Sequence, residues 1–244
     1  MKGKRLDDRL VEEDLAETRS RARALIMTGS VLVDDVPVDK AGATVKPDAR
    51  IRIKGELRRF VSRGGDKLAG ALDDLGVDPS GLYCLDIGAS TGGFSDCLLQ
   101  RGARGVVALD VGHSQLHDKI RRDSRVHVLE KTNARDLAPE HLPEPVDLVV
   151  VDVSFISIKL LLPPIAAVAP DAELLLMVKP QFEVGREQVG KGGVVRDDAL
   201  RKSAADEISG SAQALGYDEK GRVDSRVLGP KGNREIFLWM RGRG

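Results

Sequence analysis

The sequence predicts an α/β fold in which helices cover both faces of an open, mostly parallel sheet, preceded by a small α+β module. From residue 82 onward, short apolar runs alternate with helical stretches, as in a parallel sheet with crossover helices. Before residue 55, two helical stretches are followed by brief runs of alternating apolar residues. A chain of 244 residues has room for both parts.

The first module is expected to contain two helices and three short strands. Apolar residues recur at helical spacing over 5–15, and Thr18 is placed to cap a second helix that Gly29 ends near residue 28. Asp34 and Asp35 separate the first two strands, and the absence of glycine there predicts a turn longer than two residues. The expected strands are 31–33, 36–38 and 51–53.

Basic residues are concentrated in the N-terminal quarter, although the whole chain has a net charge of zero. Residues 1–63 hold five Lys and ten Arg against eleven acidic residues, a net charge of +4. Arg19 and Arg23 lie four positions apart, on one face of the second helix. Such a face is commonly only solvated, and the alternative is a surface that follows RNA phosphates. Charge alone leaves both interpretations open.

Composition indicates a globular cytoplasmic protein without a membrane segment. The sequence is 41% hydrophobic and 31% charged, and no apolar run approaches the roughly 18 residues of a membrane span. Residues 1–30 carry charges throughout and lack the apolar centre of a signal peptide. Cys84 and Cys97 have no neighbouring His, so we expect both to be buried and reduced and expect no metal site.

The larger part is expected to contain seven strands, with a glycine-rich turn after the first. That turn runs Asp86-Ile-Gly88-Ala-Ser-Thr-Gly92-Gly93 into a helix over 94–101, and its small residues let a ligand approach the backbone. Its spacing differs from that of dinucleotide-binding proteins. The expected strands are 82–87, 105–110, 126–129, 146–153, 174–178, about 222–227 and 235–240.

Two acids next to this turn indicate which ligand it binds. Asp86 suits a ligand that carries a cationic amino group, and Asp110, which ends the next strand, suits the two ribose hydroxyls of an adenosine. Together they favour S-adenosylmethionine. The alternative is that both acids only cap strand ends.

A second glycine-rich stretch resembles the start of a phosphate-binding P-loop. It runs from Gly185 to Gly190-Lys191, but Gly192 stands where a P-loop needs Ser or Thr to bind magnesium. ATP hydrolysis is therefore not expected, and a mobile flap over the site accounts better for these glycines.

Four distant ionisable residues are expected at one edge of the sheet. Asp152 and Lys179 follow predicted strands, and the carboxyl ends of parallel strands share an edge. Glu235 reaches the same edge if the last strand is antiparallel, and Lys67 lies on a helix over 65–75 that could reach over the pocket. A lysine in a dry pocket can accept the proton of an alcohol. Each residue also has an ordinary interpretation as a loop cap or a solvated charge.

Phe155 follows Asp152 in the segment Asp-Val-Ser-Phe. This segment lacks the paired prolines that are usual where a base amine is methylated, so it favours another acceptor. Phe155 could stack on a displaced base, and a core position is an equally good interpretation.

The first module resembles the S4-type RNA-binding domain. The resemblance rests on Arg5-Leu-Asp, on Thr18-Arg19-x-x-Ala-x-x-Leu-Ile-x-x-Gly-x-Val-x-Val and on Val38-x-Lys40. It implies that Arg5, Arg19, Arg23 and Lys40 contact folded RNA.

The remainder resembles FtsJ-type methyltransferases and, over nearly the whole chain, the haemolysin A (TlyA) family. The resemblance rests on Val61-Ser-Arg-Gly-Gly-x-Lys67, Leu85-Asp-Ile-Gly-Ala-Ser-Thr-Gly-Gly-Phe94, Asp110-Val-Gly, Val151-Asp-Val-Ser-Phe-Ile-Ser, Lys179-Pro-Gln-Phe-Glu and Gly229-Pro-Lys-Gly-Asn-x-Glu235. It implies a Rossmann-like class I methyltransferase domain over 64–244 with an antiparallel last strand, an S4 domain over 1–55 and a linker over 56–63. The linker sequence Arg58-Arg59-Phe60-Val61 differs from the usual family form.

The same resemblance implies 2'-O-methylation of cytidines in ribosomal RNA, on assembled subunits. Lys179 would be the base, with Lys67, Asp152 and Glu235 orienting it and the ribose. The S-adenosylmethionine site would comprise Asp86, Gly88, Ala89, Ser90, Thr91, Gly92, Gly93, Asp110, Val111 and Asn133. Two rival functions stay open: an RNA-binding ribosome-assembly factor with an inactive pocket, and a membrane-active haemolysin, for which the sequence offers no amphipathic segment. The oligomeric state is open between monomer and weak dimer.

Overall fold

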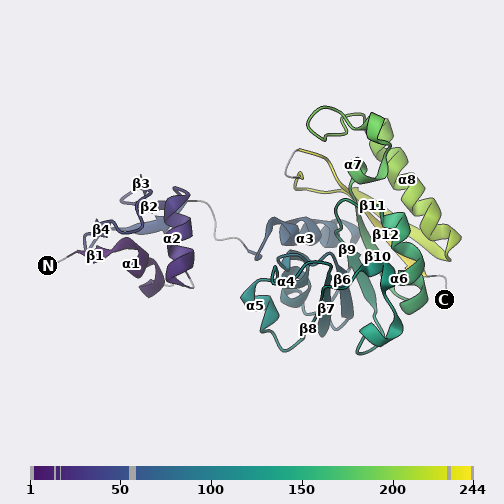
Figure 1. Ribbon diagram of the computed structural model, residues 1–244, viewed down its shortest axis with the longest axis horizontal. Helices are drawn as coiled ribbons and strands as arrows, with labels where there is room; N and C mark the ends of the chain where they lie inside the picture. The colour runs from purple at the N-terminus through teal and green to yellow at the C-terminus, as the bar shows by residue number, and fades with distance from the viewer. Residues whose placement is uncertain (1–2, 14, 17, 55–58, 230–231, 243–244) are drawn as a thin grey trace. The chain divides into compact units, whose positions relative to one another are not determined.

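A computed structural model describes residues 3–13, 15–16, 18–54, 59–229 and 232–242, and it divides the chain into two compact units (Figure 1). The first unit is Met1–Arg59 and the second is Phe60–Gly244. Residues 60–63 of the expected linker therefore pack within the second unit, where Phe60 is buried. Residues 56–58 of that linker, and residues 230–231 of the segment before Glu235, lie outside the described residues.

The first unit packs two short helices against small antiparallel sheets. Thr18 caps the second helix through its side chain, which accepts a hydrogen bond from Arg21 N, and Gly29 follows that helix with φ +67°. Leu6, Leu10 and Ile26 are fully buried in the core between the helices and strands. The elements are α1 (Leu6–Glu12), α2 (Arg19–Met27), a sheet in the order β3 (Val36–Val38), β2 (Val31–Val33), β5 (Ile51–Ile53), and the pair β1 (Lys4–Arg5) with β4 (Thr44–Val45).

The turn between β2 and β3 is shorter than we predicted. Val33 pairs with Val36, so that only Asp34 and Asp35 form the turn, and both adopt left-handed backbone angles, with φ 50° and 66°. Asp tolerates this conformation because its short side chain forms local hydrogen bonds. Here Asp34 Oδ1 accepts a hydrogen bond from Arg50 N at 2.9 Å. The expectation of a longer turn was wrong.

The second unit is built on a seven-stranded sheet in the order β11-β12-β10-β9-β6-β7-β8. Strands β6 to β10 are parallel, and β12 runs antiparallel to both of its neighbours. This confirms the mostly parallel sheet with an antiparallel last strand. The strands are β6 (Tyr83–Ile87), β7 (Gly105–Asp110), β8 (Val126–Glu130), β9 (Leu148–Val151), β10 (Glu173–Val178), β11 (Tyr217–Asp224) and β12 (Ile236–Gly242).

Helices cover both faces of this sheet, as Figure 1 shows. Successive residues of β10 point to opposite faces: Leu174 and Leu176 pack with α6 and α8, and Leu175 packs with α3 and α4. The helices are α3 (Arg63–Leu75), α4 (Gly93–Gln100), α5 (Asp118–Arg121), α6 (Leu162–Val168), α7 (Pro180–Glu183) and α8 (Asp198–Ala214), with 3-10 turns η1 (Ala134–Asp136), η2 (Pro139–His141), η3 (Ile158–Leu160) and η4 (Arg186–Gln188).

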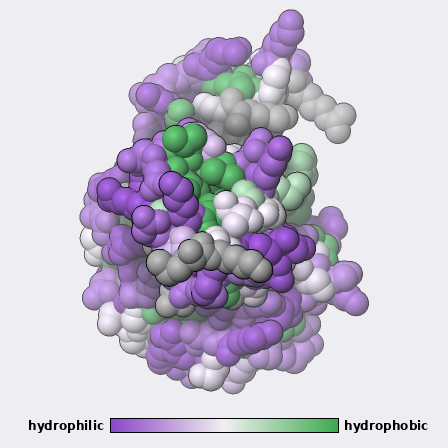
Figure 2. All heavy atoms as spheres, turned by 90° about the vertical axis from the view of Figure 1, so that its left-hand side faces the viewer, coloured by the Kyte–Doolittle hydropathy of each residue, from purple (hydrophilic) through white to green (hydrophobic). Residues whose placement is uncertain are grey.

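The strand register brings the chemically interesting segments to one edge of the sheet. Ile87 pairs with Val151, and Val178 pairs with Ile236. The segments that follow β6, β9 and β10 therefore lie at the same edge of the sheet as the start of β12, and the one after β10 is next to it. Hydrophilic side chains dominate the face of the molecule drawn in Figure 2, with a limited apolar area among them.

Candidate active site

The glycine-rich turn after β6 depends on its first glycine. Gly88 has φ +87°, and a Cβ added there would lie 2.4 Å from the carbonyl oxygen of Asp152. A side chain at this position would therefore clash with the backbone that follows β9. The amides of Gly88 and Ala89 both donate to the carbonyl of Leu109, at 2.9 and 3.0 Å. The turn is thus held between the ends of β7 and β9.

Asp110 is fixed beside this turn by two backbone amides. Its Oδ2 accepts a hydrogen bond from Ser90 N at 2.8 Å, and its Oδ1 accepts one from Gly112 N at 2.7 Å. A carboxylate has further lone pairs, so these bonds leave acceptor capacity for a ligand. This is the arrangement expected of an acid that holds ribose hydroxyls.

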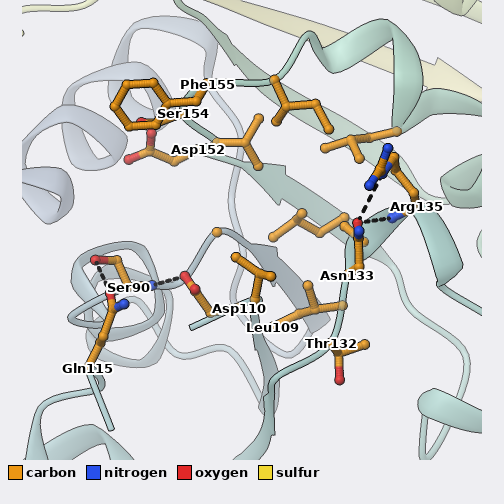
Figure 3. A pocket seen from close by; sticks show the side chains of 17 residues that line it. Ser90, Leu109, Asp110, Gln115, Thr132, Asn133, Arg135, Asp152, Ser154 and Phe155 are labelled. Carbon is orange, nitrogen blue, oxygen red and sulfur yellow. Dashed lines mark hydrogen bonds between the residues drawn. The ribbon is translucent and has the colours of Figure 1, made fainter. Parts of the chain in front are cut away.

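A cavity of about 540 Å³ opens between this turn and the segment after β9 (Figure 3). Its volume falls within the range of small-molecule sites. Five of the predicted cofactor residues line it: Gly88, Ser90, Asp110, Val111 and Asn133. Asp152 and Phe155 line it as well. Gln115, Thr132 and Ser154 also line it and were not predicted as site residues, although Ser154 belongs to the segment Asp-Val-Ser-Phe. Asp86, Ala89, Thr91, Gly92 and Gly93 belong to β6, the turn or the start of α4 and do not line this cavity.

Asp86 is a buried acid, and one of its two carboxylate oxygens accepts no hydrogen bond from the described residues. Its Oδ2 accepts hydrogen bonds from Ser95 N at 2.9 Å and from Ser95 Oγ at 2.6 Å. Its Oδ1 has no partner among the described residues. Burial raises the pKa of Asp86 to about 7, and the hydrogen bonds from Ser95 oppose that rise. Asp86 thus keeps one acceptor oxygen that no described residue uses, although it does not line the cavity.

Two ion pairs stand at the same edge of the sheet. Lys67 on α3 pairs with Glu235, and both side chains are almost fully buried. Lys179 pairs with Asp152, and its Nζ also donates to Ser154 Oγ at 3.0 Å. Lys179 directly follows Val178 and Glu235 directly precedes Ile236, and those two residues are paired between β10 and β12. The four predicted residues are therefore brought together as two neighbouring pairs.

Phe155 is exposed, so the interpretation as a core residue was wrong. Phe155 is 91% exposed and its φ is +66°, an unusual value for a bulky residue. Its ring centroid lies 5.1 Å from that of Phe182 on α7. A strained backbone that presents an aromatic ring at the mouth of a cavity is typical of functional positions.

The glycine-rich stretch after α7 is anchored by Asn233. Asn233 is 2% exposed, its Oδ1 accepts from Val195 N at 3.0 Å, and its Nδ2 donates to Gly193 O at 2.8 Å. Gly190 and Val194 form an isolated bridge. The stretch is therefore attached to the loop that leads into Glu235, and its proposed role as a mobile flap stays a prediction.

The predicted RNA-binding arginines also lie together, in the first unit. Arg5, Arg19 and Arg23 all hydrogen-bond the carboxylate of Asp7. Lys40 is exposed and lies in the turn after β3. Sequence reasoning missed Asp7, although Arg5-Leu-Asp7 was part of the pattern.

The two cysteines, Cys84 and Cys97, are buried and free, as the sequence predicted. Burial raises the pKa of Cys84 to about 12. Within the described ranges, no helix is long and apolar enough to cross a membrane, and no group of three or more His, Cys, Asp or Glu residues could hold a metal ion.

Comparison with known proteins agrees with this geometry. A family described as FtsJ-like methyltransferase matches residues 60–242, and the S4 domain family matches residues 4–51. The chain is 47% identical to the 16S/23S rRNA (cytidine-2'-O)-methyltransferase TlyA of Mycobacterium tuberculosis, over 97% of this chain and 89% of that protein. The chain belongs to the TlyA family of FtsJ-like methyltransferases.

Two further TlyA-family relatives carry the older family name. Hemolysin A of Brachyspira hyodysenteriae is 41% identical over 96% of this chain and 98% of its own length. The solved structure of a putative hemolysin from Streptococcus thermophilus superposes with a TM-score of 0.76, at 37% identity, over 99% of this chain and 89% of that chain.

The two family matches and the similarity to the Mycobacterium tuberculosis enzyme show that the chain is a methyltransferase with an S4 domain and that its cofactor is S-adenosyl-L-methionine.

Proposed function

We propose that this TlyA-family member methylates the 2'-hydroxyl of cytidine ribose in ribosomal RNA, within assembled ribosomal subunits. The substrate is inferred from the relative in Mycobacterium tuberculosis, whose name states this reaction. The observation that carries the proposal is the convergence of the Lys67–Glu235 and Lys179–Asp152 pairs at the edge of the sheet where the cofactor cavity opens.

In this proposal Lys179 is the residue that takes the proton of the ribose hydroxyl. The ribose hydroxyl is a weak acid, so a positioned base is needed while the oxygen attacks. Asp152 and Ser154 both line the cavity and hold the Lys179 amine. The amine therefore lies at the border of the cavity. Glu235, which directly precedes β12, holds Lys67 of α3 beside this site.

The cofactor is assigned to the cavity beside the glycine-rich turn. Asp110 would bind the ribose hydroxyls of the cofactor, with Val111 and Asn133 beside the adenine and the backbone from Gly88 to Gly93 against the amino acid part. Asp86, whose Oδ1 is unpartnered, would accept from the cationic amino group. When bound, S-adenosyl-L-methionine supplies an electrophilic methyl group.

Phe155 and Phe182 are the proposed platform for the target base. Both rings lie next to the cavity, and Phe155 is largely exposed in this structure. Stacking of a base on an aromatic ring contributes about 1–3 kcal/mol, which helps to offset the cost of unstacking the base from its RNA neighbours.

The reaction can be tested with separated ribosomal subunits and S-adenosyl-L-methionine that carries a labelled methyl group. We expect label in ribosomal RNA, on a cytidine, at a position that becomes resistant to alkaline cleavage because the 2'-oxygen is blocked. Mass spectrometry of nuclease fragments locates the nucleotide. Label on a base, or on RNA only after the subunit proteins are removed, would contradict the proposal.

Replacement of the proposed base should separate catalysis from binding. We expect Lys179→Ala to lower kcat by about 10²- to 10⁴-fold, the usual contribution of general acid-base catalysis, because the proton acceptor is lost. The dissociation constant of the cofactor should stay unchanged, as measured by calorimetry. Lys202→Ala is a matched control, since Lys202 is an exposed residue of α8 that pairs only with Asp198 among the described residues.

Binding of ribosomal RNA without methyl transfer by the wild-type protein would favour the assembly-factor alternative.

A further inference from the structure

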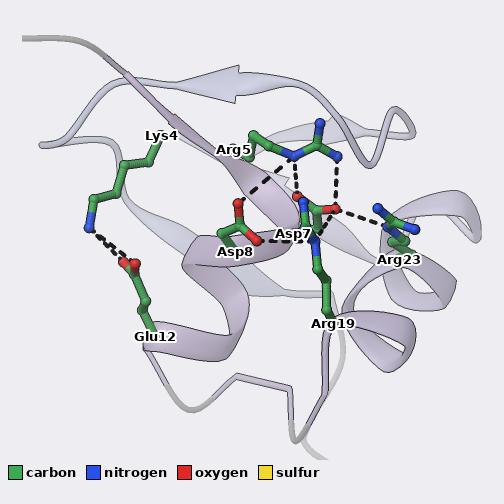
Figure 4. A network of polar contacts seen from close by, with 7 residues as sticks. All are labelled: Lys4, Arg5, Asp7, Asp8, Glu12, Arg19 and Arg23. Atoms are coloured by element: carbon green, nitrogen blue, oxygen red, sulfur yellow. Dashed lines mark hydrogen bonds and ion pairs between the residues drawn. The ribbon is translucent and has the colours of Figure 1, made fainter.

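A fully buried acid lies beneath the arginines of the first unit (Figure 4). Asp7 Oδ1 accepts a hydrogen bond from Arg5 Nε at 2.9 Å. Its Oδ2 accepts from Arg5 Nη2 at 2.9 Å, from Arg19 Nε at 3.1 Å and from Arg23 Nε at 3.0 Å. A carboxylate has about four lone-pair sites, and four guanidinium hydrogen bonds reach Asp7, three of them at Oδ2. One acid on α1 thus orients three arginines from two elements.

The arginines keep donor groups for another ligand. Arg19 and Arg23 reach Asp7 through Nε, and no described residue accepts a hydrogen bond from their terminal Nη groups. Their side chains are about half exposed, at 49% and 51%. The guanidinium groups are therefore held at one end and open to solvent at the other.

The charge of this cluster favours an anion. Three arginines face two acids, Asp7 and Asp8, which leaves a net charge of +1. The hydrogen bond from Arg5, followed by those from Arg23 and Arg19, holds the pKa of Asp7 well below its usual range, so Asp7 is ionised at any physiological pH. Forked guanidinium donors match the geometry of phosphate oxygens.

We propose that Asp7 is a positioning residue that holds Arg5, Arg19 and Arg23 as a preformed site for RNA backbone phosphate. The proposal rests on the proposed function only in that RNA is taken as the ligand. A free arginine loses much rotamer freedom when it binds. Asp7 restricts the three side chains before RNA arrives, so less freedom is lost on binding.

The positioning role and a simple charge effect predict opposite changes in RNA affinity for Asp7→Asn. The substitution removes a negative charge from a basic surface, which by electrostatics alone should tighten RNA binding by about twofold at moderate salt. Asn replaces one of the two acceptor oxygens with an NH2 donor and carries no charge, so it can no longer hold all three arginines. This effect should outweigh the gain in charge because it acts on every contact of the cluster.

The experiment measures the affinity of the full-length protein for deproteinised 23S ribosomal RNA at about 0.1 M salt. We expect Asp7→Asn to weaken binding about tenfold, which is about 1.4 kcal/mol. Affinity equal to or tighter than that of the wild type overturns the proposal. Circular dichroism and thermal unfolding report whether the variant is folded.

A charge-conserving variant decides the question if Asp7→Asn fails to fold. The double substitution of Arg19→Lys with Arg23→Lys leaves Asp7 in place, alters only exposed side chains and keeps the net charge. We expect several-fold weaker binding with an unchanged dependence on salt, because a lysine has no fork to orient. Arg21→Lys, on the same helix and outside the cluster, is the matched control and should bind as the wild type does. Wild-type affinity of the double variant overturns the proposal.

A methylation assay distinguishes failure of this site from failure of the proposed function. With ribosomal subunits as substrate, Asp7→Asn should raise KM, while kcat at saturating subunits and the dissociation constant of S-adenosyl-L-methionine stay unchanged. A fall in kcat at unchanged KM overturns the positioning role. Absence of methyl transfer by the wild-type protein bears on the proposed function, and the RNA affinities then still decide the role of Asp7.

Discussion

At the residue scale, Asp86 is the buried acid whose ionisation should most affect the stability of the ligand-free protein. Its carboxyl group is fully buried, one oxygen has no partner among the described residues, and burial raises its pKa to about 7. In the unfolded chain the same group ionises near pH 3.8. Folding therefore takes up a proton at this residue between about pH 4 and pH 7.

The sign of the pH dependence follows from that proton uptake. Because the folded state binds more protons in this window, Asp86 makes the ligand-free protein less stable as pH rises through it, and the effect levels off above pH 7. We expect Asp86→Asn to raise the free energy of unfolding at pH 8 by about 1–3 kcal/mol and to change it little at pH 4. Urea unfolding without cofactor measures this. The same variant should bind S-adenosyl-L-methionine more weakly, and stronger binding would refute the assignment of Asp86 to the cofactor site.

Single residues also show where sequence reasoning reached its limit. The position of Phe155 after a strand end was predictable, but its exposure was not, because it depends on a left-handed backbone angle that Phe rarely adopts. The length of the turn at Asp34 and Asp35 was predicted wrongly for the same reason, since both residues adopt left-handed backbone angles that are more typical of glycine. In each case the surrounding structure decided the backbone conformation.

At the element scale, Asn233 joins two loops that the sequence does not relate. It connects Gly193 and Val195 of the glycine-rich stretch to the loop before β12, and Gly229 N donates to its carbonyl oxygen at 2.9 Å. That second loop also approaches the Glu235 carboxylate, since a Cβ added at Gly229 would lie 2.9 Å from Glu235 Oε1. Asn233 thereby links the glycine-rich stretch to the Lys67–Glu235 pair.

Asn233→Ala should loosen this connection. The substitution leaves the amide of Val195 without an acceptor in a buried position, which should lower the free energy of unfolding by about 1–3 kcal/mol. Hydrogen exchange of residues 185–195 should accelerate, as measured by mass spectrometry of peptides. Gln213→Ala, on the exposed surface of α8, is a control. Unchanged exchange in this stretch would mean that other contacts hold it.

The elements of the second unit were predictable because their apolar runs are long and lie between turn residues. Every expected strand from residue 82 onward has an observed counterpart, although the strand expected over about 222–227 begins earlier, at Tyr217. The two-residue strand β1 was not predicted, because it depends on pairing with β4 about forty residues away. Short elements that rest on distant partners leave no periodic pattern.

At the scale of the whole molecule, the second unit begins at Phe60, four residues earlier than the start at residue 64 that the sequence indicated. Phe60 is 2% exposed, Val61 N donates to Asp96 Oδ2 at 2.9 Å, and the Ser62 side chain caps α3. A Cβ added at Gly65 would lie 2.3 Å from Phe60, which shows how closely this segment packs on the helix. Phe60 and Val61 thus pack in the core of the methyltransferase domain, and Ser62 caps its first helix.

Two truncated proteins test this boundary. A chain of residues 60–244 should fold and bind S-adenosyl-L-methionine but should not methylate ribosomal subunits, because it lacks the RNA-binding unit. A chain of residues 64–244 should be less stable by about 2–4 kcal/mol, since it loses the burial of Phe60 and the cap of α3. Denaturant unfolding compares the two proteins. Equal stability would place the boundary at residue 64, as the sequence suggested.

The sequence by itself determined the layered α/β sheet, the S4-type module and the identity of the ionisable residues that meet at one edge. The sheet follows from local periodicity, and the shared edge follows from the rule that the carboxyl ends of parallel strands meet there. The S4-type module and the four-residue set were indicated by resemblance to known families. Only the tertiary structure decided that the four residues form two separate ion pairs, that Ser154 holds Lys179, and that Asp7 organises three arginines. The physical reason is that such contacts depend on side-chain directions across elements distant in the chain, which spacing along the sequence does not encode.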